Sequence, residues 1–269
     1  MSNTILLVGS GKMGQAMLGG WIDTFVKPSD IVVIDPNAEN LAVAKGLGCA
    51  GHSSPDDIEG AFRPDVIVLA VKPQMMVDVL PTFRTLAAGG ALIISIAAGT
   101  GIAQFETAFG VTASIIRAMP NTPAAVRQGM IVCCQNGHAS PQQLEICDKL
   151  MTAIGTVAWI EDEKLMDAVT GLSGSGPAYV FYMIEAMAAA GVRAGLPADL
   201  AETLAEVTVA GAGKLAISSD EPASKLRENV TSPNGTTAAG LAILMAEDGL
   251  APLIEKTVAA ATKRSRELG

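Results

Sequence analysis

The chain changes character near residue 161, and this change limits the possible folds more than any other feature. Before that point, short apolar runs alternate with helical patterns. The clearest runs, rich in Val, Ile and Leu, are residues 4–8, 31–34, 66–71 and 92–96, with weaker ones at 114–117, 130–134 and 156–160. Helical patterns lie between them at residues 12–24, 38–46, 74–88, 102–109 and 141–154. Such alternation predicts a parallel, doubly wound α/β sheet that is covered on both faces.

The rest of the chain carries no strand signal. Its Ala-, Leu- and Met-rich segments predict helices at residues 163–170, 177–194, 197–217, 223–229, 236–247 and 251–266. Several are apolar around most of their circumference, and such helices must be buried. A segment as short as 162–269 has little interior of its own. We therefore predict two domains, 1–161 and 162–269, of which the second is all-α and forms the interface of a homodimer.

Composition limits the partners of this chain. Its 269 residues are 49% hydrophobic, enough for a core without disulfides or metal. The net charge of −9 argues against nucleic acid or an anionic membrane as the main partner. The longest apolar stretch, residues 178–192, contains Glu185 and is too short for a membrane span. We see no signal peptide, no C-x-x-C pair, and His52 and His138 only in polar stretches. These features predict a cytoplasmic protein without a metal site.

A glycine motif directly follows the first predicted strand. Residues 9–14 read Gly-Ser-Gly-Lys-Met-Gly and open a helical pattern. In a G-x-G-x-x-G turn, Gly9 permits the tight bend, Gly11 lets the backbone approach a pyrophosphate, and Gly14 lets helix and strand pack closely. The N–H groups at the helix start favour phosphate. The motif predicts an NAD(P) site whose contacts include Gly9, Ser10, Gly11, Lys12, Met13 and Gly14.

Asp35 ends the second predicted strand, 21 residues after Gly14. A carboxylate at this position hydrogen-bonds the adenosine ribose and repels a 2′-phosphate, so the pattern leans toward NADH. Lys45 or Arg63 could offset that repulsion and admit NADPH. Alternatively, Asp35 is only a turn residue before Pro36.

Two further strand ends are expected at the same edge of the sheet. They carry Ala70-Val71-Lys72-Pro73 and, after the fourth strand, Ala97-Ala98-Gly99. Open α/β sheets bind ligands outside the carboxyl ends of their strands, and small side chains let the backbone approach a nicotinamide ribose. Lys72 either donates to a ribose hydroxyl or is simply solvated.

Two loops in the helical half carry polar groups. Residues 172–177, Leu-Ser-Gly-Ser-Gly-Pro, interrupt a helical run with a proline suited to the first turn of the next helix. Residues 231–237, Thr-Ser-Pro-Asn-Gly-Thr-Thr, precede another helix. Their backbone N–H groups, with Ser232, Thr236 and Thr237, form an anion cradle. The alternative is ordinary helix capping.

Six blocks, spread over nearly the whole chain, together resemble pyrroline-5-carboxylate reductase. They are residues 9–14, 70–73, 95–99, Arg-Ala-Met-Pro-Asn-Thr-Pro at 117–123, Asp-Ala-Val-Thr-Gly-Leu-Ser-Gly-Ser-Gly-Pro-Ala at 167–178, and Asn-Val-Thr-Ser-Pro-Asn-Gly-Thr-Thr at 229–237. The resemblance implies an α/β Rossmann-like N-terminal domain and an all-α C-terminal dimerisation domain. It also implies homodimers that can form decamers, with 1-pyrroline-5-carboxylate as substrate, NADPH or NADH as cofactor and L-proline as product.

The resemblance also assigns residues. It implies substrate contacts at Glu163, Asn229, Thr236 and Thr237, to which the argument on the 231–237 loop adds Ser232 and Gly235. Among these, the Thr237 hydroxyl would lie at the imine nitrogen and act in catalysis. Implied cofactor contacts are Ser10, Lys12, Met13, Val71, Lys72, Pro73 and Ala98, to which the strand-end argument adds Ala70 and Ala97.

Two positions depart from the family pattern. The carboxylate loop has Asn234-Gly235 where the family has two glycines, and asparagine tolerates the left-handed backbone that this turn would need. At Asp35 many family members carry a small polar or basic residue and prefer NADPH. The acid puts that preference in doubt.

Two other functions remain open on the sequence. One is a β-hydroxyacid-type NAD(P)-dependent dehydrogenase, for which Lys214 or Lys225 would be the catalytic lysine, although neither lies in that family's motif. The other is a noncatalytic NAD(P)-sensing module.

Overall fold

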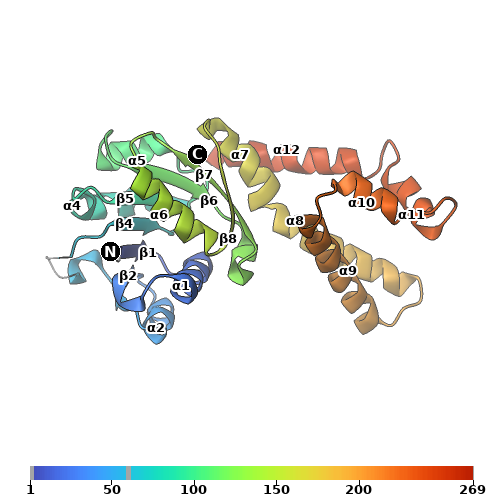
Figure 1. Cartoon of the computed structure of the whole chain (residues 1–269), viewed down its shortest axis with the longest axis horizontal. Coiled ribbons are helices and arrows are strands. Elements are labelled where there is room, and N and C mark those ends of the chain that lie inside the picture. Colours follow the sequence, from blue (N-terminus) through green and yellow to red (C-terminus); the bar gives the residue numbers. More distant parts are fainter. Residues whose placement is uncertain (1–2, 59–61, 269) are drawn as a thin grey trace. The chain divides into compact units, whose positions relative to one another are not determined.

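The computed structural model describes residues 3–58 and 62–268, which divide into two compact units (Figure 1). The sheet unit comprises Met1–Gly174 and Ala261–Gly269, and the helical unit comprises Ser175–Ala260. The C-terminal helix thus begins in one unit and ends in the other. The functional boundary between residues 161 and 162 stays a prediction.

A single eight-stranded sheet forms the centre of the sheet unit, within the described residues. Its strands are β1 (Ile5–Val8), β2 (Ile31–Ile34), β3 (Ala50–His52), β4 (Val66–Leu69), β5 (Leu92–Ser95), β6 (Ile115–Met119), β7 (Gly129–Gln135) and β8 (Gly155–Trp159). They lie in the order β3-β2-β1-β4-β5-β6-β7-β8. The carboxyl ends of β1, β2, β4 and β5 therefore share one edge, because these neighbours are all parallel.

The sheet is parallel as predicted, except that β6 and β7 are antiparallel. Residues 120–128 connect them through a short 3₁₀ segment, Thr122–Val126, which ends at Arg127 with φ of 58°. A connection this short lacks the crossover helix that a parallel pair requires. Strand β3 was not predicted, since Ala50-Gly51-His52 has no apolar pattern.

Four helices of the sheet unit match the predicted periodicity, namely α1 (Lys12–Thr24), α2 (Ala38–Gly46), α5 (Ile102–Phe109) and α6 (Pro141–Thr152). The pattern at residues 74–88 instead divides into α3 (Met76–Val79) and α4 (Arg84–Ala87), separated by the 3₁₀ segment Leu80–Phe83. Pro81 lies in that segment, and proline cannot donate the backbone hydrogen bond that a continuous α-helix needs.

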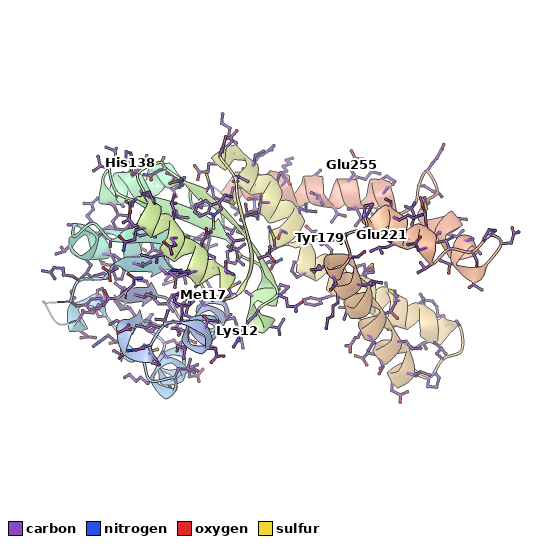
Figure 2. All side chains as sticks on the ribbon, in the orientation of Figure 1. Lys12, Met17, His138, Tyr179, Glu221 and Glu255 are labelled. Atoms are coloured by element: carbon purple, nitrogen blue, oxygen red, sulfur yellow. The ribbon has the colours of Figure 1, made fainter. Side chains whose placement is uncertain are left out.

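Alternating strand residues supply two cores, one on each face of the sheet. Leu7 of β1 packs in a cluster with Met17 and Trp21 of α1 and with residues of α2 and α6. Leu6 packs in the opposite cluster with Phe83 and with residues of α3 and α5. Met17 is fully buried, whereas Lys12 at the start of the same helix is exposed (Figure 2). Both faces are covered, which explains why the strands are apolar on both sides.

The predicted loop at 172–177 takes the form of a π-helical turn. The chain passes from α7 (Met166–Val169) through this turn, Thr170–Gly174, into α8 (Gly176–Arg193). Pro177 occupies the first turn of α8, as predicted.

The helical unit contains α8, α9 (Ala198–Ser218), α10 (Ala223–Asn229), α11 (Thr236–Leu244) and most of α12 (Leu250–Leu268). Helices α8 and α9 pack closely at Gly191, where an added Cβ would lie only 3.2 Å from the Cβ of Ala201. Within residues 175–260, all of them described, only Ala201 and Ala205 are buried. No helix in the described ranges has the length and apolarity to cross a membrane.

A stripe of apolar side chains remains exposed along α9, formed by Leu200, Leu204, Val207 and Leu215. Their spacing of three, four and eight residues places them on one side of the helix. Contiguous exposed apolar side chains of this kind are unusual on a soluble monomeric domain.

Gly19 and Gly20 of α1 provide a matched test of this packing. A Cβ on Gly20 would lie 2.7 Å from the Ala153 carbonyl oxygen, whereas a Cβ on Gly19 has no atom within 4 Å. We expect Gly19→Ala to raise the free energy of unfolding by up to about 1 kcal/mol, because alanine favours helix. Gly20→Ala should lower it by about 1–3 kcal/mol through overpacking.

Urea titration followed by tryptophan fluorescence measures both effects. The two tryptophans, Trp21 and Trp159, lie in the sheet unit and report on it alone. Equal effects of the two substitutions would contradict this account of the packing.

Candidate active site

The glycine loop connects β1 to α1, and its glycines meet different demands. Gly9 has φ of 91°, and a Cβ there would lie 2.7 Å from the Ala70 carbonyl oxygen. A Cβ on Gly14 would lie 2.5 Å from the Gly9 carbonyl oxygen. A Cβ on Gly11 would meet no atom within 4 Å. Gly9 and Gly14 are therefore required by the fold, whereas Gly11 keeps space open in front of the helix.

The start of α1 fits a bound phosphate. Its N-cap residue, Gly11, makes no side-chain capping bond, and its first turn has no acidic residue. The first N–H groups of this helix are thus available to an anion. The Ser10 hydroxyl is buried without a hydrogen-bond partner in the protein, which is rare. A bound ligand or water molecule would satisfy it. Together with the open space at Gly11, these features fit the pyrophosphate of NAD(P).

Asp35 directly follows β2 and is only 6% exposed. Its Oδ2 accepts hydrogen bonds from the Ser10 backbone N–H at 2.6 Å and from Asn40 Nδ2 at 3.0 Å. Its Oδ1 accepts from the Asn37 backbone N–H at 2.8 Å. Asp35 is therefore more than a turn residue, because it joins the glycine loop to the end of β2.

The other predicted cofactor residues lie at the same edge of the sheet. Residues 70–73 follow β4, and residues 97–98 follow β5, next to each other in the strand order. Ala97 is buried, and its N–H donates to Ser95 Oγ at 3.3 Å. Lys72 is exposed at the start of a 3₁₀ segment, so its two predicted alternatives remain open. The fold thus assembles all the predicted cofactor residues along one edge.

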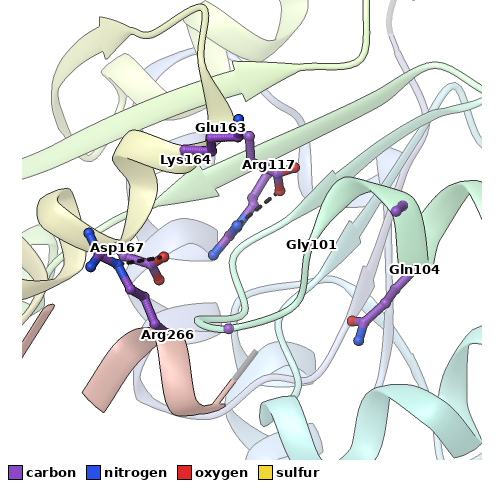
Figure 3. Close-up of a pocket in the computed structure, with 9 residues that line it drawn as sticks. Gly101, Gln104, Arg117, Glu163, Lys164, Asp167 and Arg266 are labelled. Atoms are coloured by element: carbon purple, nitrogen blue, oxygen red, sulfur yellow. Dashed lines mark hydrogen bonds and ion pairs between the residues drawn. The ribbon is translucent and has the colours of Figure 1, made fainter. Parts of the chain in front are cut away.

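A second polar cluster surrounds Glu163 in the sheet unit (Figure 3). Glu163 Oε1 accepts from Arg117 Nη1 and from the Ile102 backbone N–H, both at 2.9 Å. The Arg117 side chain is only 7% exposed, and Glu163 is also its salt-bridge partner. This ion pair was not predicted from the sequence. Its signal was a lone arginine within the apolar run of β6, which needs a buried partner.

The cluster borders a pocket of about 470 Å³. The residues that line it are Arg117, Glu163, Lys164, Asp167 and Arg266, together with Gly99, Gly101, Ala103 and Gln104. Asp167 accepts from Ser265 Oγ at 2.7 Å and lies 3.9 Å from Arg266 Nε. These contacts attach the end of α12 to α7 within the sheet unit.

Asn121 links two of the family blocks. Its Nδ2 donates to the Ser173 carbonyl oxygen at 3.1 Å, and its Oδ1 accepts from the Met130 N–H at 2.9 Å. A Cβ on Gly174 would lie 2.6 Å from Met119 Cε. The segments around residues 119–121 and 173–174 are therefore packed together, and Asn121 acts as a structural residue that the sequence analysis did not single out.

The predicted carboxylate loop lies in the helical unit. Asn234 has φ of 60°, the left-handed conformation expected for this replacement of glycine. A Cβ on Gly235 would lie 2.4 Å from Ser232 Oγ and 3.1 Å from the Ser232 carbonyl oxygen, so a larger residue here would require the Ser232 side chain to move. Gly235 is the N-cap of α11 and makes no side-chain capping bond, which leaves the first N–H groups of α11 available. Ser232, Thr236 and Thr237 are exposed around this helix start.

Asn229 ends α10, and its Nδ2 donates to Glu221 Oε2 at 2.8 Å. Glu221 was not predicted. Of the predicted substrate contacts, Glu163 belongs to the sheet unit, and Asn229 to Thr237 belong to the helical unit. Within the described residues, no group of three or more His, Cys, Asp or Glu side chains could hold a metal ion.

A parallel sheet with a glycine loop, an uncapped first helix and an acidic residue after β2 defines a dinucleotide-binding oxidoreductase of the Rossmann type. Residues 4–99 match the family described as NADP oxidoreductase, coenzyme F420-dependent. Residues 163–268 match the family described as pyrroline-5-carboxylate reductase dimerisation.

Full-length relatives specify the family. The chain is 41% identical to pyrroline-5-carboxylate reductase of Pisum sativum, over 99% of this chain and 96% of that protein. It is 42% identical to the Synechocystis sp. enzyme of the same name, over 100% and 99%. The chain belongs to the pyrroline-5-carboxylate reductase family.

Solved structures agree with this assignment. The pyrroline-5-carboxylate reductase of Coxiella burnetii superimposes with a TM-score of 0.93 at 33% identity, covering 100% of this chain and 99% of that chain. The Plasmodium falciparum pyrroline carboxylate reductase with NADP bound gives 0.85 at 30% identity, covering 99% and 98%.

The open space at Gly11 leads to a prediction. Serine is a good N-cap residue, so Gly11→Ser should leave stability unchanged or slightly higher. Its side chain would compete with phosphate for the N–H groups of α1, and we expect the Kd of NADH and NADPH to rise at least about tenfold. Nucleotide fluorescence measures the Kd, and urea titration measures stability.

Gly14→Ala is the contrasting variant, since its Cβ would meet the Gly9 carbonyl oxygen and lower the stability itself. Unchanged cofactor affinity in Gly11→Ser would show that the start of α1 does not bind the pyrophosphate.

Proposed function

We propose that this protein reduces 1-pyrroline-5-carboxylate to L-proline by hydride transfer from NADPH or NADH, the last step of proline biosynthesis. The main observation in support is that the chain matches pyrroline-5-carboxylate reductases over essentially its whole length. The open, uncapped start of α1 supports binding of the dinucleotide. The bound nicotinamide would supply the hydride.

The chemistry explains why the chain needs few catalytic groups. A cyclic imine is basic enough to exist partly as its iminium, which accepts hydride without a strong protein acid. The work of the protein is then to hold the substrate close to the cofactor, with reacting atoms about 3–3.5 Å apart, and to exclude water. Thr237, at the start of α11, would hydrogen-bond the ring nitrogen and help keep the proton on it as the hydride is transferred.

The start of α11 is the proposed binding site of the substrate carboxylate. Its free N–H groups and the hydroxyls of Ser232 and Thr236 suit an anion. The Asn229 amide, held by Glu221, borders this loop in sequence. Glu163 already accepts two hydrogen bonds through Oε1, so its second oxygen would be the atom that meets substrate.

The alternatives have weaker support. The lysines that a β-hydroxyacid dehydrogenase would need are exposed, and Lys225 lies 3.6 Å from Glu228. A noncatalytic NAD(P)-sensing module would not need the α11 loop. Protein that binds NADH without consuming it in the presence of pyrroline-5-carboxylate would favour that module.

We also propose a homodimer, with a decamer as the larger assembly that the family resemblance implies. The family's dimerisation region at 163–268 and the exposed apolar stripe of α9 support the dimer. A cytoplasmic location is part of the proposal, in keeping with a biosynthetic role and with four cysteines that are buried and free. The partner of the reaction is the small imine, not nucleic acid or membrane.

Thr237→Ala tests the catalytic role. Loss of the hydroxyl should lower kcat for pyrroline-5-carboxylate by about 10²–10⁴-fold, the range for an acid–base group. The fold and the Kd of NADH should be unchanged, because Thr237 is exposed in the first turn of a helix that favours alanine. Thr237→Ser keeps the hydroxyl and should retain most of the activity. Full turnover by Thr237→Ala would remove this residue from catalysis.

Val207→Glu tests the dimer. Val207 lies in the α9 stripe and is 66% exposed in the single chain. Light scattering should give the wild type a mass of at least twice its 27.5 kDa chain. A charge buried in an apolar interface is strongly unfavourable, so the variant should dissociate. Val111→Glu, at a similarly exposed valine of the sheet unit, should keep the wild-type mass. A monomeric wild type would refute the proposal.

A further inference from the structure

The Asp35 carboxylate is part of a closed ring of hydrogen bonds that includes Asn40, Gln15 and Ser10. Asn40 Nδ2, on the first turns of α2, donates to Asp35 Oδ2 at 3.0 Å. Gln15 Nε2, on α1, donates to Asn40 Oδ1 at 3.4 Å and to the Ser10 carbonyl oxygen at 3.0 Å. The Ser10 N–H donates to Asp35 and closes the ring. The ring therefore connects the glycine loop, the end of β2 and two helices.

The ring leaves Asp35 little freedom. A carboxylate has about four lone-pair sites. Three of them are used by Ser10, Asn37 and Asn40, so one acceptor site on Oδ1 remains. Because Asp35 is 6% exposed, a rotation that broke these bonds would leave a buried charge unsatisfied. Asn40 supplies the only one of these three bonds that comes from a side chain.

We propose that Asn40, seated by Gln15, is a positioning residue that fixes the Asp35 carboxylate, and that this unit sets the preference for NADH over NADPH. The inference rests on the proposed use of NAD(P)H and concerns how the chain distinguishes the two forms. A carboxylate held in one orientation has its remaining lone pair pre-organised for a ribose hydroxyl. It also cannot turn away from a 2′-phosphate, so the full repulsion acts on NADPH.

Asn40→Leu tests the proposal, since leucine has a similar shape and no hydrogen-bond donor. We expect the Kd of NADH to rise about five- to tenfold, because the Asp35 carboxylate is no longer held in the orientation that binds the ribose hydroxyl. The Kd of NADPH should be unchanged or fall. The ratio of the two Kd values, measured by nucleotide fluorescence without substrate, should shift toward NADPH. Glu39→Gln, on the neighbouring exposed position of α2, controls for local charge and should leave the ratio unchanged.

A double-variant cycle shows whether Asn40 acts through Asp35. Asp35→Ser alone should shift the ratio toward NADPH. Adding Asn40→Leu to Asp35→Ser should change the ratio no further, because the group that Asn40 orients is gone. Gln15→Met, which removes the amide at similar size, should shift the ratio in the same direction by a smaller factor and serves if Asn40→Leu does not fold.

The outcomes are distinguishable. An equal rise of both Kd values in Asn40→Leu, or a further shift of the ratio in the double variant, would show that Asn40 only supports the structure and would overturn the proposal. These titrations need no imine reduction. Failure to form proline would therefore count against the proposed function and leave this inference to be decided by the binding ratio.

Discussion

The Gly9 carbonyl oxygen lies so close to the first turn of α1 that a methyl group on Gly14 would stand 2.5 Å away from it. This contact fixes the angle at which α1 leaves the sheet, and therefore the direction of the N–H groups at its start. On its other side, Gly9 is pressed against the Ala70 carbonyl after β4. The positions of two strand ends and one helix start thus depend on the absence of two side chains. The geometry of the cofactor edge follows from steric exclusion before any ligand is present.

Local patterns predicted most of the fold. The bounds of β2, α1, α2 and α5 follow from apolar periodicity and from glycines, which act through neighbouring residues. Asn234 could be placed in the left-handed region because that demand is also local. The missed features depend on distant residues. Strand β3 is stabilised by its pairing with β2, and the reversal at β7 follows from the length of the 120–128 connection.

The candidate site divides in the same way. The common edge of the proposed cofactor residues was predictable because they lie at or after the ends of strands, and parallel neighbours end at one edge. The Arg117–Glu163 and Asn121–Ser173 pairs were not, since their partners are 46 and 52 residues apart in sequence. The three hydrogen bonds to Asp35 were also not predicted, since the sequence suggested either a ribose contact or a turn residue at this position. Long-range polar pairs produce no periodic pattern in the sequence. A single polar side chain therefore does not indicate which distant residue will be its hydrogen-bond partner.

The distribution of buried polar groups agrees with a reaction that depends on placement. Asp35, Arg117 and Ser10 are among the few buried polar residues among those described, and none of them is a strong acid–base candidate for the imine. Asp35 instead holds the glycine loop at the end of β2 through three hydrogen bonds, and Arg117 forms a partly buried ion pair with Glu163. A buried network of this kind is favourable only if its members are satisfied, and it then specifies one arrangement. Because an iminium accepts hydride readily, precise loops contribute more to such a reaction than additional catalytic groups would.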